Sequence, residues 1–199
     1  MSRIGVIVFV KNPELGKVKT RLAASVGDEE ALAIYIRLLD HTCDVMSGLP
    51  TVQRYVFYSQ KVMHNDRWPE DTFIKSQQVD GDLGHKLKAA FAEVFTQCDK
   101  VIVIGSDCAQ LSSSHIQDAI NQLDRCNVVI GPSLDGGYYL LGMDKNYSFL
   151  FDNITWSTAT VYVETIDNAL HNGLTYTSIE QLSDIDYIED WEQYGLGDQ

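Results

Sequence analysis

Positive charge is concentrated in one short segment of an otherwise acidic chain. The 199 residues carry a formal net charge of −13. Within residues 11–21 only Glu14 opposes the basic side chains, which are Lys11, Lys17, Lys19 and Arg21. The segment follows the apolar run 4–10, which predicts a buried strand. A basic loop at the end of such a strand is typical of a phosphate site, and Gly16 would let backbone amides approach the phosphate.

This basic loop is not a Walker A motif. That motif would need Gly at position 11 and Ser or Thr at position 18, where the chain has Lys11 and Val18. The alternative to a phosphate site is a solvated basic loop with no ligand.

Carboxylates at two later points have the chemistry of a metal site. Asp107 directly follows the apolar run 100–105, so it is placed to hold Mg²⁺ or Mn²⁺ against phosphate oxygens. Asp184 and Asp186 alternate in an extended segment, which points both carboxylates to one side and predicts a second arm for the same metal. The alternatives are ordinary capping by Asp107 and an acid cluster at a helix N-terminus.

The segment 131–139 predicts a loop with little side-chain bulk. Asp135 is the candidate catalytic residue, because it could act as a base on a hydroxyl or an amine. Gly136, Gly137 and Tyr138, together with Trp156 further along, are the candidate wall of the acceptor or sugar pocket. The alternative is a hairpin in which Asp-Gly only makes the turn. A second glycine motif, with Gly81 and Gly84, opens a helix and is expected to admit a base or ribose; an ordinary N-terminal turn is the alternative.

Hydrophobic periodicity predicts alternating strands and helices. We expect strands at 3–10, 54–59, 72–77, 100–105, 127–130, 138–143 and 175–179, and helices at 28–46, 83–97, 113–123, 158–171 and 188–194. This order predicts an α/β fold, a three-layer α/β/α sandwich with a mostly parallel sheet, as a single domain over residues 1–199. Ligands of such folds bind at the carboxyl ends of the strands, which is where the basic loop and Asp107 fall.

Composition excludes several classes of function. Apolar residues make up 45% of the chain, and no stretch is long enough for a membrane span. The N-terminus lacks the pattern of a signal peptide, so we expect a cytoplasmic protein with reduced cysteines. The acidic balance argues against nucleic-acid binding. Cys108 lies beside an acid, which favours a packing role over a nucleophilic one.

Taken in order, these segments resemble a known family. They are Lys11-Asn-Pro-x-x-Gly-Lys-x-Lys-Thr-Arg-Leu22, Gly81-Asp-Leu-Gly84, Gly105-Ser-Asp-Cys108, Gly131-Pro-x-x-Asp-Gly-Gly-Tyr-Tyr139, Trp156-Ser-Thr158 and Asp184-Ile-Asp186. They are similar to bacterial glycosyltransferase-A-like proteins, often labelled selenodomain-associated or radical-SAM-associated transferases. One departure is Ala109, where the family usually has Pro.

The resemblance implies a nucleotide-diphospho-sugar transferase (GT-A) fold, with nucleotide phosphates on the loop after the first strand. It also implies a metal on Asp107 with help from Asp184 or Asp186. Our first expectation is a Mg²⁺- or Mn²⁺-dependent glycosyltransferase that uses a nucleotide-sugar and a small-molecule acceptor. The alternative is a nucleotidyltransferase, similar to guanylyltransferases, that uses an NTP and releases pyrophosphate. A third possibility is an inactive nucleotide-binding protein.

Overall fold

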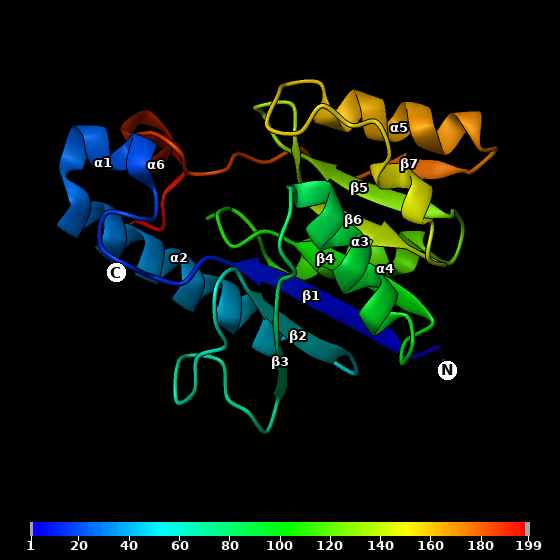
Figure 1. Cartoon of the computed structure of the whole chain (residues 1–199), viewed down its shortest axis with the longest axis horizontal. Helices are drawn as coiled ribbons and strands as arrows, with labels where there is room; N and C mark the ends of the chain where they lie inside the picture. Colours follow the sequence, from blue (N-terminus) through cyan, green and yellow to red (C-terminus); the bar gives the residue numbers. More distant parts are fainter. Residues whose placement is uncertain (1, 198–199) are drawn as a thin grey trace.

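Seven strands form one mixed sheet in the order β3-β2-β1-β4-β6-β5-β7 (Figure 1). The structure is a computed structural model that describes residues 2–197. The strands are β1 (Ile4–Val10), β2 (Gln53–Tyr58), β3 (Phe73–Gln77), β4 (Lys100–Ile104), β5 (Val128–Pro132), β6 (Tyr138–Met143) and β7 (Tyr176–Ser178). All neighbouring strands are parallel except β6, which runs antiparallel to β4 and β5. The predicted α/β fold with a mostly parallel sheet is confirmed.

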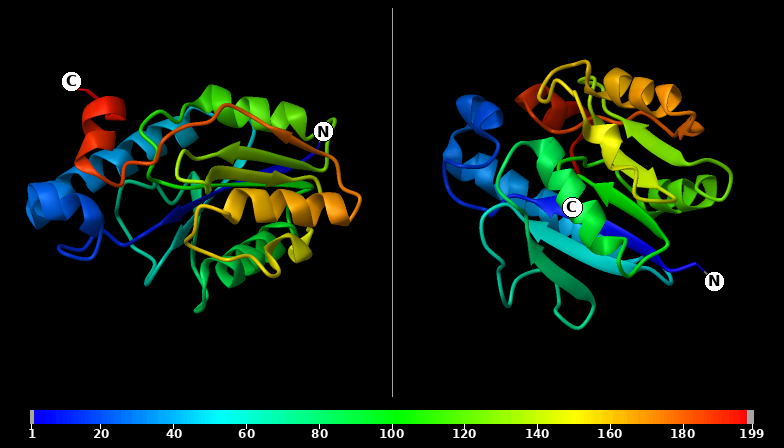
Figure 2. Two further views of the ribbon diagram at one scale, coloured as in Figure 1. Left: turned by 90° about the horizontal axis from the view of Figure 1, so that it is seen from above. Right: turned by 45° about the vertical axis from the view of Figure 1, so that its right-hand side comes forward.

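Helices cover both faces of this sheet. They are α1 (Thr20–Val26), α2 (Asp28–Ser47), α3 (Leu83–Val94), α4 (Ser113–Gln122), α5 (Val161–His171) and α6 (Ile188–Tyr194), with a 3₁₀ turn at Ser148–Phe151. The buried sides of α2 and α4 pack on one face, and those of α3 and α5 pack on the other (Figure 2). Among the described residues, no helix combines the length and apolar character needed to cross a membrane.

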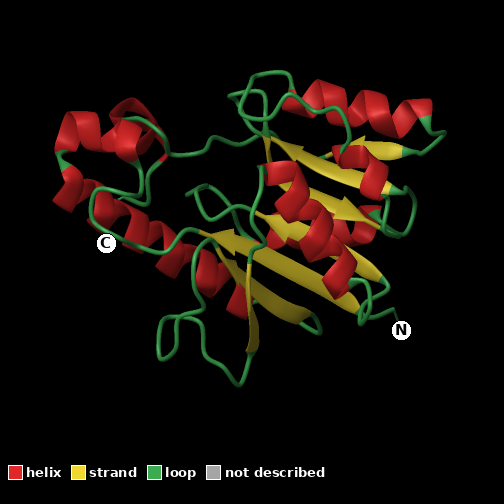
Figure 3. Cartoon of the chain, in the orientation of Figure 1, coloured by secondary structure: helices red, strands yellow, loops and turns green. Residues whose placement is uncertain are grey.

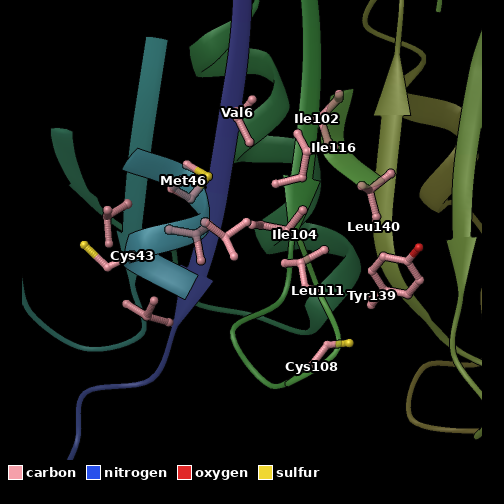
Figure 4. Packing of buried hydrophobic residues seen from close by; sticks show 14 of the residues in the cluster. Val6, Cys43, Met46, Ile102, Ile104, Cys108, Leu111, Ile116, Tyr139 and Leu140 are labelled. Carbon is pink, nitrogen blue, oxygen red and sulfur yellow. The ribbon is translucent and has the colours of Figure 1, made fainter. Parts of the chain in front are cut away.

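The central strands are apolar on both sides because both faces of the sheet are covered. Figure 4 shows the side of the core that includes Val6, Ile104, Leu111 and Cys108. Burial, followed by the nearby Asp184 carboxylate, raises the pKa of the Cys108 thiol to about 12. The prediction that Cys108 is a packing residue is therefore confirmed.

One helix was not expected from the sequence. The segment predicted as a basic loop through Arg21 already turns into α1 at Thr20. Helix α1 packs with the start of α2 and with α6 around the buried side chains of Leu22, Ile34 and Ile185. These helices form a group of their own beside the sheet, into which the loop after β1 leads (Figure 3).

Residues 131–139 include the turn between β5 and β6, and the two interpretations of this segment are compatible with each other. Because β5 and β6 pair antiparallel, this segment is a hairpin turn, and Gly136 adopts a φ of 89° in it. The loops after β1, β4 and β5 all leave the same edge of the sheet (Figure 3). The parallel topology therefore brings together segments that are far apart in the sequence.

Candidate functional site

A cavity of about 610 Å³ lies at this edge of the sheet. It is lined by Lys11, Lys17, Lys19, Thr20, Arg21, Leu83, Asp107, Asp135, Gly137, Tyr138, Trp156, Ser157, Thr158, Ala159, Val161, Asp184 and Asp186. All four predicted basic residues and all four predicted acidic site residues line this cavity. The structure therefore brings the basic loop and the acids to one place.

Lys19 is the buried centre of the charged part of the cavity. Its side chain is only 5% exposed, and its Nζ donates to Asp107 Oδ2 at 2.8 Å. The same ammonium lies 3.5 Å from Asp186 Oδ1, and Asp186 Oδ2 accepts from Arg21 Nη1 at 2.9 Å. Lys19 has a φ of 48°, in the left-handed region, directly before α1. A non-glycine residue held there costs about 1–2 kcal/mol, which the ion pairs must offset.

The ion pair changes the protonation behaviour of both partners. Burial alone would raise the pKa of Asp107, but the Lys19 ammonium beside it holds that pKa below its ordinary value. Burial would likewise lower the pKa of Lys19, but the carboxylates of Asp107, Asp186 and Asp184 raise it above its ordinary value. Both groups therefore stay charged at neutral pH.

Asp184 has a different environment from Asp186. Its Oδ2 accepts from Ser133 Oγ at 2.9 Å. Burial, followed by the neighbouring Asp107 carboxylate, raises the pKa of Asp184 to about 7. Asp184 and Asp186 line the same cavity, as predicted, but only Asp186 is paired with the cations of the basic loop.

The predicted metal ligands do not form a complete metal site made of protein alone. Among residues 2–197, no three His, Cys, Asp or Glu side chains are grouped as such a site. A nucleotide-bound Mg²⁺ needs only one or two carboxylates, because phosphates and water complete its coordination. Asp107 and Asp186 supply such oxygens beside the cations of residues 11–21. The donor set therefore fits a metal that arrives with a phosphate ligand.

Two residues that the sequence analysis missed fix the basic loop in place. The Tyr35 hydroxyl accepts from Lys11 N at 2.9 Å, donates to Lys11 O at 3.1 Å and lies 3.4 Å from Ser106 Oγ. Asn12 Oδ1 accepts from Gln60 N at 3.0 Å. Tyr35 lies within the predicted helix 28–46, and no role at the basic loop was predicted for it. The available signal was its hydroxyl, since a buried tyrosine needs a hydrogen-bond partner.

The second wall of the cavity consists of the β5–β6 turn and the segment 156–161. Asp135 Oδ1 accepts from Gly137 N at 2.9 Å, which fixes the carboxylate at the cavity edge. A Cβ on Gly136 would lie 2.2 Å from Ala159 O, and Gly136 O accepts from Tyr162 N at 3.0 Å. Gly136 is therefore required by a protein contact and is not itself on the cavity wall.

Three other glycines predicted to contact nucleotide have structural explanations, and none of them is on the cavity wall. Gly16 has a φ of 71° in a turn closed by Lys17 N donating to Glu14 O at 3.0 Å. A Cβ on Gly81 would meet His85 at 2.6 Å, and a Cβ on Gly84 would meet Trp156 Nε1 at 2.5 Å. Gly84 thus makes room for Trp156, which does line the cavity. Direct contact of Gly16, Gly81 and Gly84 with a nucleotide stays a prediction.

The chain matches one protein family over more than half of its length. The sequence profile of the family described as "Uncharacterized protein conserved in bacteria (DUF2064)" matches residues 42–158. The chain belongs to this family. The chain is also similar to a solved protein from Desulfovibrio desulfuricans G20 that is described as a candidate nucleotide-diphospho-sugar transferase. It is 31% identical, with a TM-score of 0.86 over 94% of this chain and 84% of that one.

The curated relatives have a different description from that solved protein. A 2-phospho-L-lactate guanylyltransferase from Methanocaldococcus vulcanius is 25% identical over 135 residues, which are 68% of this DUF2064 chain and 59% of the relative. The chain thus spans about three fifths of that relative's length. The 4-diphosphocytidyl-2C-methyl-D-erythritol synthase of Anaerococcus prevotii DSM 20548 shares the fold, with a TM-score of 0.63 at 12% identity, over 98% of this chain and 95% of that one.

Proposed function

We propose that the chain is a nucleotidyltransferase, which transfers the nucleoside monophosphate part of an NTP to a small acceptor and releases pyrophosphate. One observation carries this proposal: four cationic side chains from the segment 11–21 line the same cavity as Asp107. A triphosphate has more charge to neutralise than the diphosphate of a nucleotide-sugar, and the leaving pyrophosphate gains charge as the bond breaks. The names of the curated relatives agree with this choice.

Each residue has a specific role in the proposal. Lys11, Lys17 and Arg21 bind the β- and γ-phosphates, and Lys19 stabilises the charge that develops on the leaving group. Asp107, with Asp186, would hold Mg²⁺ or Mn²⁺, which when bound neutralises phosphate charge. Asp135 is the candidate base for the acceptor, and Tyr138 with Trp156 forms the acceptor wall.

Glycosyl transfer is the second candidate. The supporting observation is the 31% identical relative described as a candidate nucleotide-diphospho-sugar transferase. In that reaction the same cations would stabilise a departing nucleoside diphosphate. The cavity itself has space and charge for either donor.

One binding experiment separates the two candidates. Thermal unfolding of the protein is followed with Mg²⁺ or Mn²⁺ and each of the common NTPs and nucleotide-sugars. A ligand at about a hundred times its Kd adds ~2.7 kcal/mol to the free energy of unfolding. Stronger stabilisation by an NTP supports nucleotidyl transfer, and stronger stabilisation by a nucleotide-sugar supports glycosyl transfer. The Arg21→Ala variant should lose the effect, and Lys145→Ala, outside the cavity lining, should keep it. No metal-dependent shift with either class would contradict both.

A further inference from the structure

The charges that line the cavity are segregated between its two walls. All the cationic side chains among the described lining residues come from residues 11–21. The second wall, formed by the β5–β6 turn and residues 156–161, contributes one charged side chain to the lining, that of Asp135. The acids Asp107, Asp184 and Asp186 line the cavity as well. The second wall itself therefore offers a ligand one carboxylate and no ammonium or guanidinium group.

The rest of this wall suits an uncharged ring or chain with hydroxyl groups. Tyr138 and Trp156 supply aromatic surface, on which the C–H faces of a polyol can pack. Ser157 adds a hydroxyl group, and Asp135 Oδ1 already accepts from Gly137 N. The second oxygen of Asp135 can accept from a ligand hydroxyl or amine. The charge-assisted pairing with Arg or Lys that makes phosphate binding strong is not offered by this wall.

The wall is held in a fixed shape by contacts outside the cavity. Glu164 Oε2 accepts from Thr155 N at 2.6 Å, and its Oε1 accepts from Thr160 Oγ1 at 2.8 Å. The turn is joined to the start of α5 by Tyr162 N donating to Gly136 O at 3.0 Å. Fixing a wall before the ligand arrives reduces the entropy that binding costs. These contacts support a binding role for the wall.

The net charge of the cavity lining favours the same class of ligand. Four cationic and four acidic side chains line it, so it starts close to neutral. A metal-bound triphosphate is still anionic and uses the cations of the basic loop. A phosphate group on an acceptor held at the second wall would then face Asp135, and that wall contributes no cationic side chain to the lining, which disfavours its binding.

We infer that the acceptor is an uncharged or amino-substituted polyol, and not a phosphorylated acid such as the one named for the curated relatives. This rests on the proposed nucleotidyl transfer. The acceptor hydroxyl oxygen forms a bond to the α-phosphorus, and the bond from that phosphorus to the α–β bridging oxygen breaks. Pyrophosphate leaves with the electron pair, and the hydroxyl proton passes to Asp135.

The test first measures NTP binding alone and then transfer. NTP binding is measured by calorimetry with Mg²⁺, which tests the proposed function by itself. Transfer is then followed with NTP labelled at the α-phosphate and matched acceptors: glucose and glucose 6-phosphate, glucosamine and glucosamine 6-phosphate, glycerol and glycerol 3-phosphate, and 2-phospholactate. We expect each unphosphorylated acceptor to exceed its phosphorylated partner by about tenfold or more in kcat/KM.

Two variants of Asp135 sharpen the result. Asp135→Asn should lower kcat, because the acceptor hydroxyl loses its base, raise KM for the best unphosphorylated acceptor about tenfold and leave NTP affinity within about twofold. In calorimetry, which needs no transfer step, Asp135→Lys should bind the phosphorylated acceptors more tightly than their unphosphorylated partners. Better use of the phosphorylated acceptors by the unmodified protein would overturn the inference, as would transfer to neither class by a protein that binds NTP. Failure of every NTP to bind would remove the proposed function, and the inference with it.

Discussion

The Lys19 ammonium donates to the Asp107 carboxylate at 2.8 Å, which joins the loop after β1 to the loop after β4. Both loops leave the same edge of the sheet, because β1 and β4 are neighbouring parallel strands. The contact therefore joins a cation of the basic loop to a predicted metal ligand. A ligand that carries both phosphate and metal can therefore meet both groups at once.

The first prediction concerns the stability of this ion pair. Lys19→Met should lower the free energy of unfolding by about 1–3 kcal/mol, because it leaves Asp107 without its cation. In the double variant with Asp107→Asn the loss should be smaller than the sum of the two single losses. Urea unfolding followed by circular dichroism measures this double-mutant cycle. As a control, Lys100→Met should cost less than about 1 kcal/mol, because its partner Asp124 is 72% exposed. Strictly additive losses would show that the pair is not coupled.

The second prediction concerns the metal. Asp107→Asn should remove the Mg²⁺ dependence of NTP binding while the circular dichroism spectrum stays that of the folded protein. An amide is a weaker ligand for a hard cation than a carboxylate, and Asp107 lies 2.8 Å from the Lys19 ammonium, beside the proposed phosphate site. Calorimetry with Mg²⁺ and with a chelator measures the difference. Asp124→Asn, outside the cavity lining, should behave like the unmodified protein. A full Mg²⁺ effect in Asp107→Asn would mean that the metal binds elsewhere.

The third prediction concerns pH. The pKa of Asp184 rises from 3.8 to about 7 on folding, mainly through burial. Between these values the folded protein holds a proton that the unfolded chain has released, so this group lowers the free energy of unfolding as the pH rises. Asp184→Asn should therefore be more stable than the unmodified protein by about 4 kcal/mol at about pH 8, and most of the gain should be lost by about pH 4. Urea unfolding across this range, in the presence of a chelator, checks it. A difference that is independent of pH would rule out this origin.

Most of the fold could be predicted because its signals are local. The unbroken apolar run of β4 and the three-four periodicity of α2 each come from burial of a neighbouring face, which the sequence records directly. The site could be located for a related reason. Parallel strands place their carboxyl ends together, so a basic loop after one strand and Asp107 after another had to meet.

The features that could not be predicted depend on contacts between residues that are distant in the sequence. Helix α1 is short, and Lys19 before it is in a left-handed conformation that only its ion pairs explain. The place of β6 between β4 and β5 follows from strand pairing that no local pattern specifies. The sequence shows that Gly84 is small but not that Trp156 fills the space beside it. For this reason the contact between Gly84 and Trp156 could not be predicted from the sequence.

The last prediction tests the second wall through Gly136. This residue has a φ of 89°, and a Cβ there would lie 2.2 Å from the backbone oxygen of Ala159. Gly136→Ala should therefore lower the free energy of unfolding by about 3 kcal/mol, from both the unfavourable φ and the clash. Gly173→Ala is a matched control with a φ of 71° and no atom within 4 Å of the added Cβ, and it should cost only about 1 kcal/mol.

The two variants should also differ in function. A clash with Ala159 would move the segment that lines the acceptor side of the cavity, while the basic loop comes from a different part of the chain. Gly136→Ala should therefore raise KM for the acceptor and leave NTP affinity close to its original value, and Gly173→Ala should change neither. Steady-state kinetics below the unfolding temperature of the weaker variant separate the two effects. Equal losses of acceptor and NTP binding in Gly136→Ala would show that the two walls are not independent.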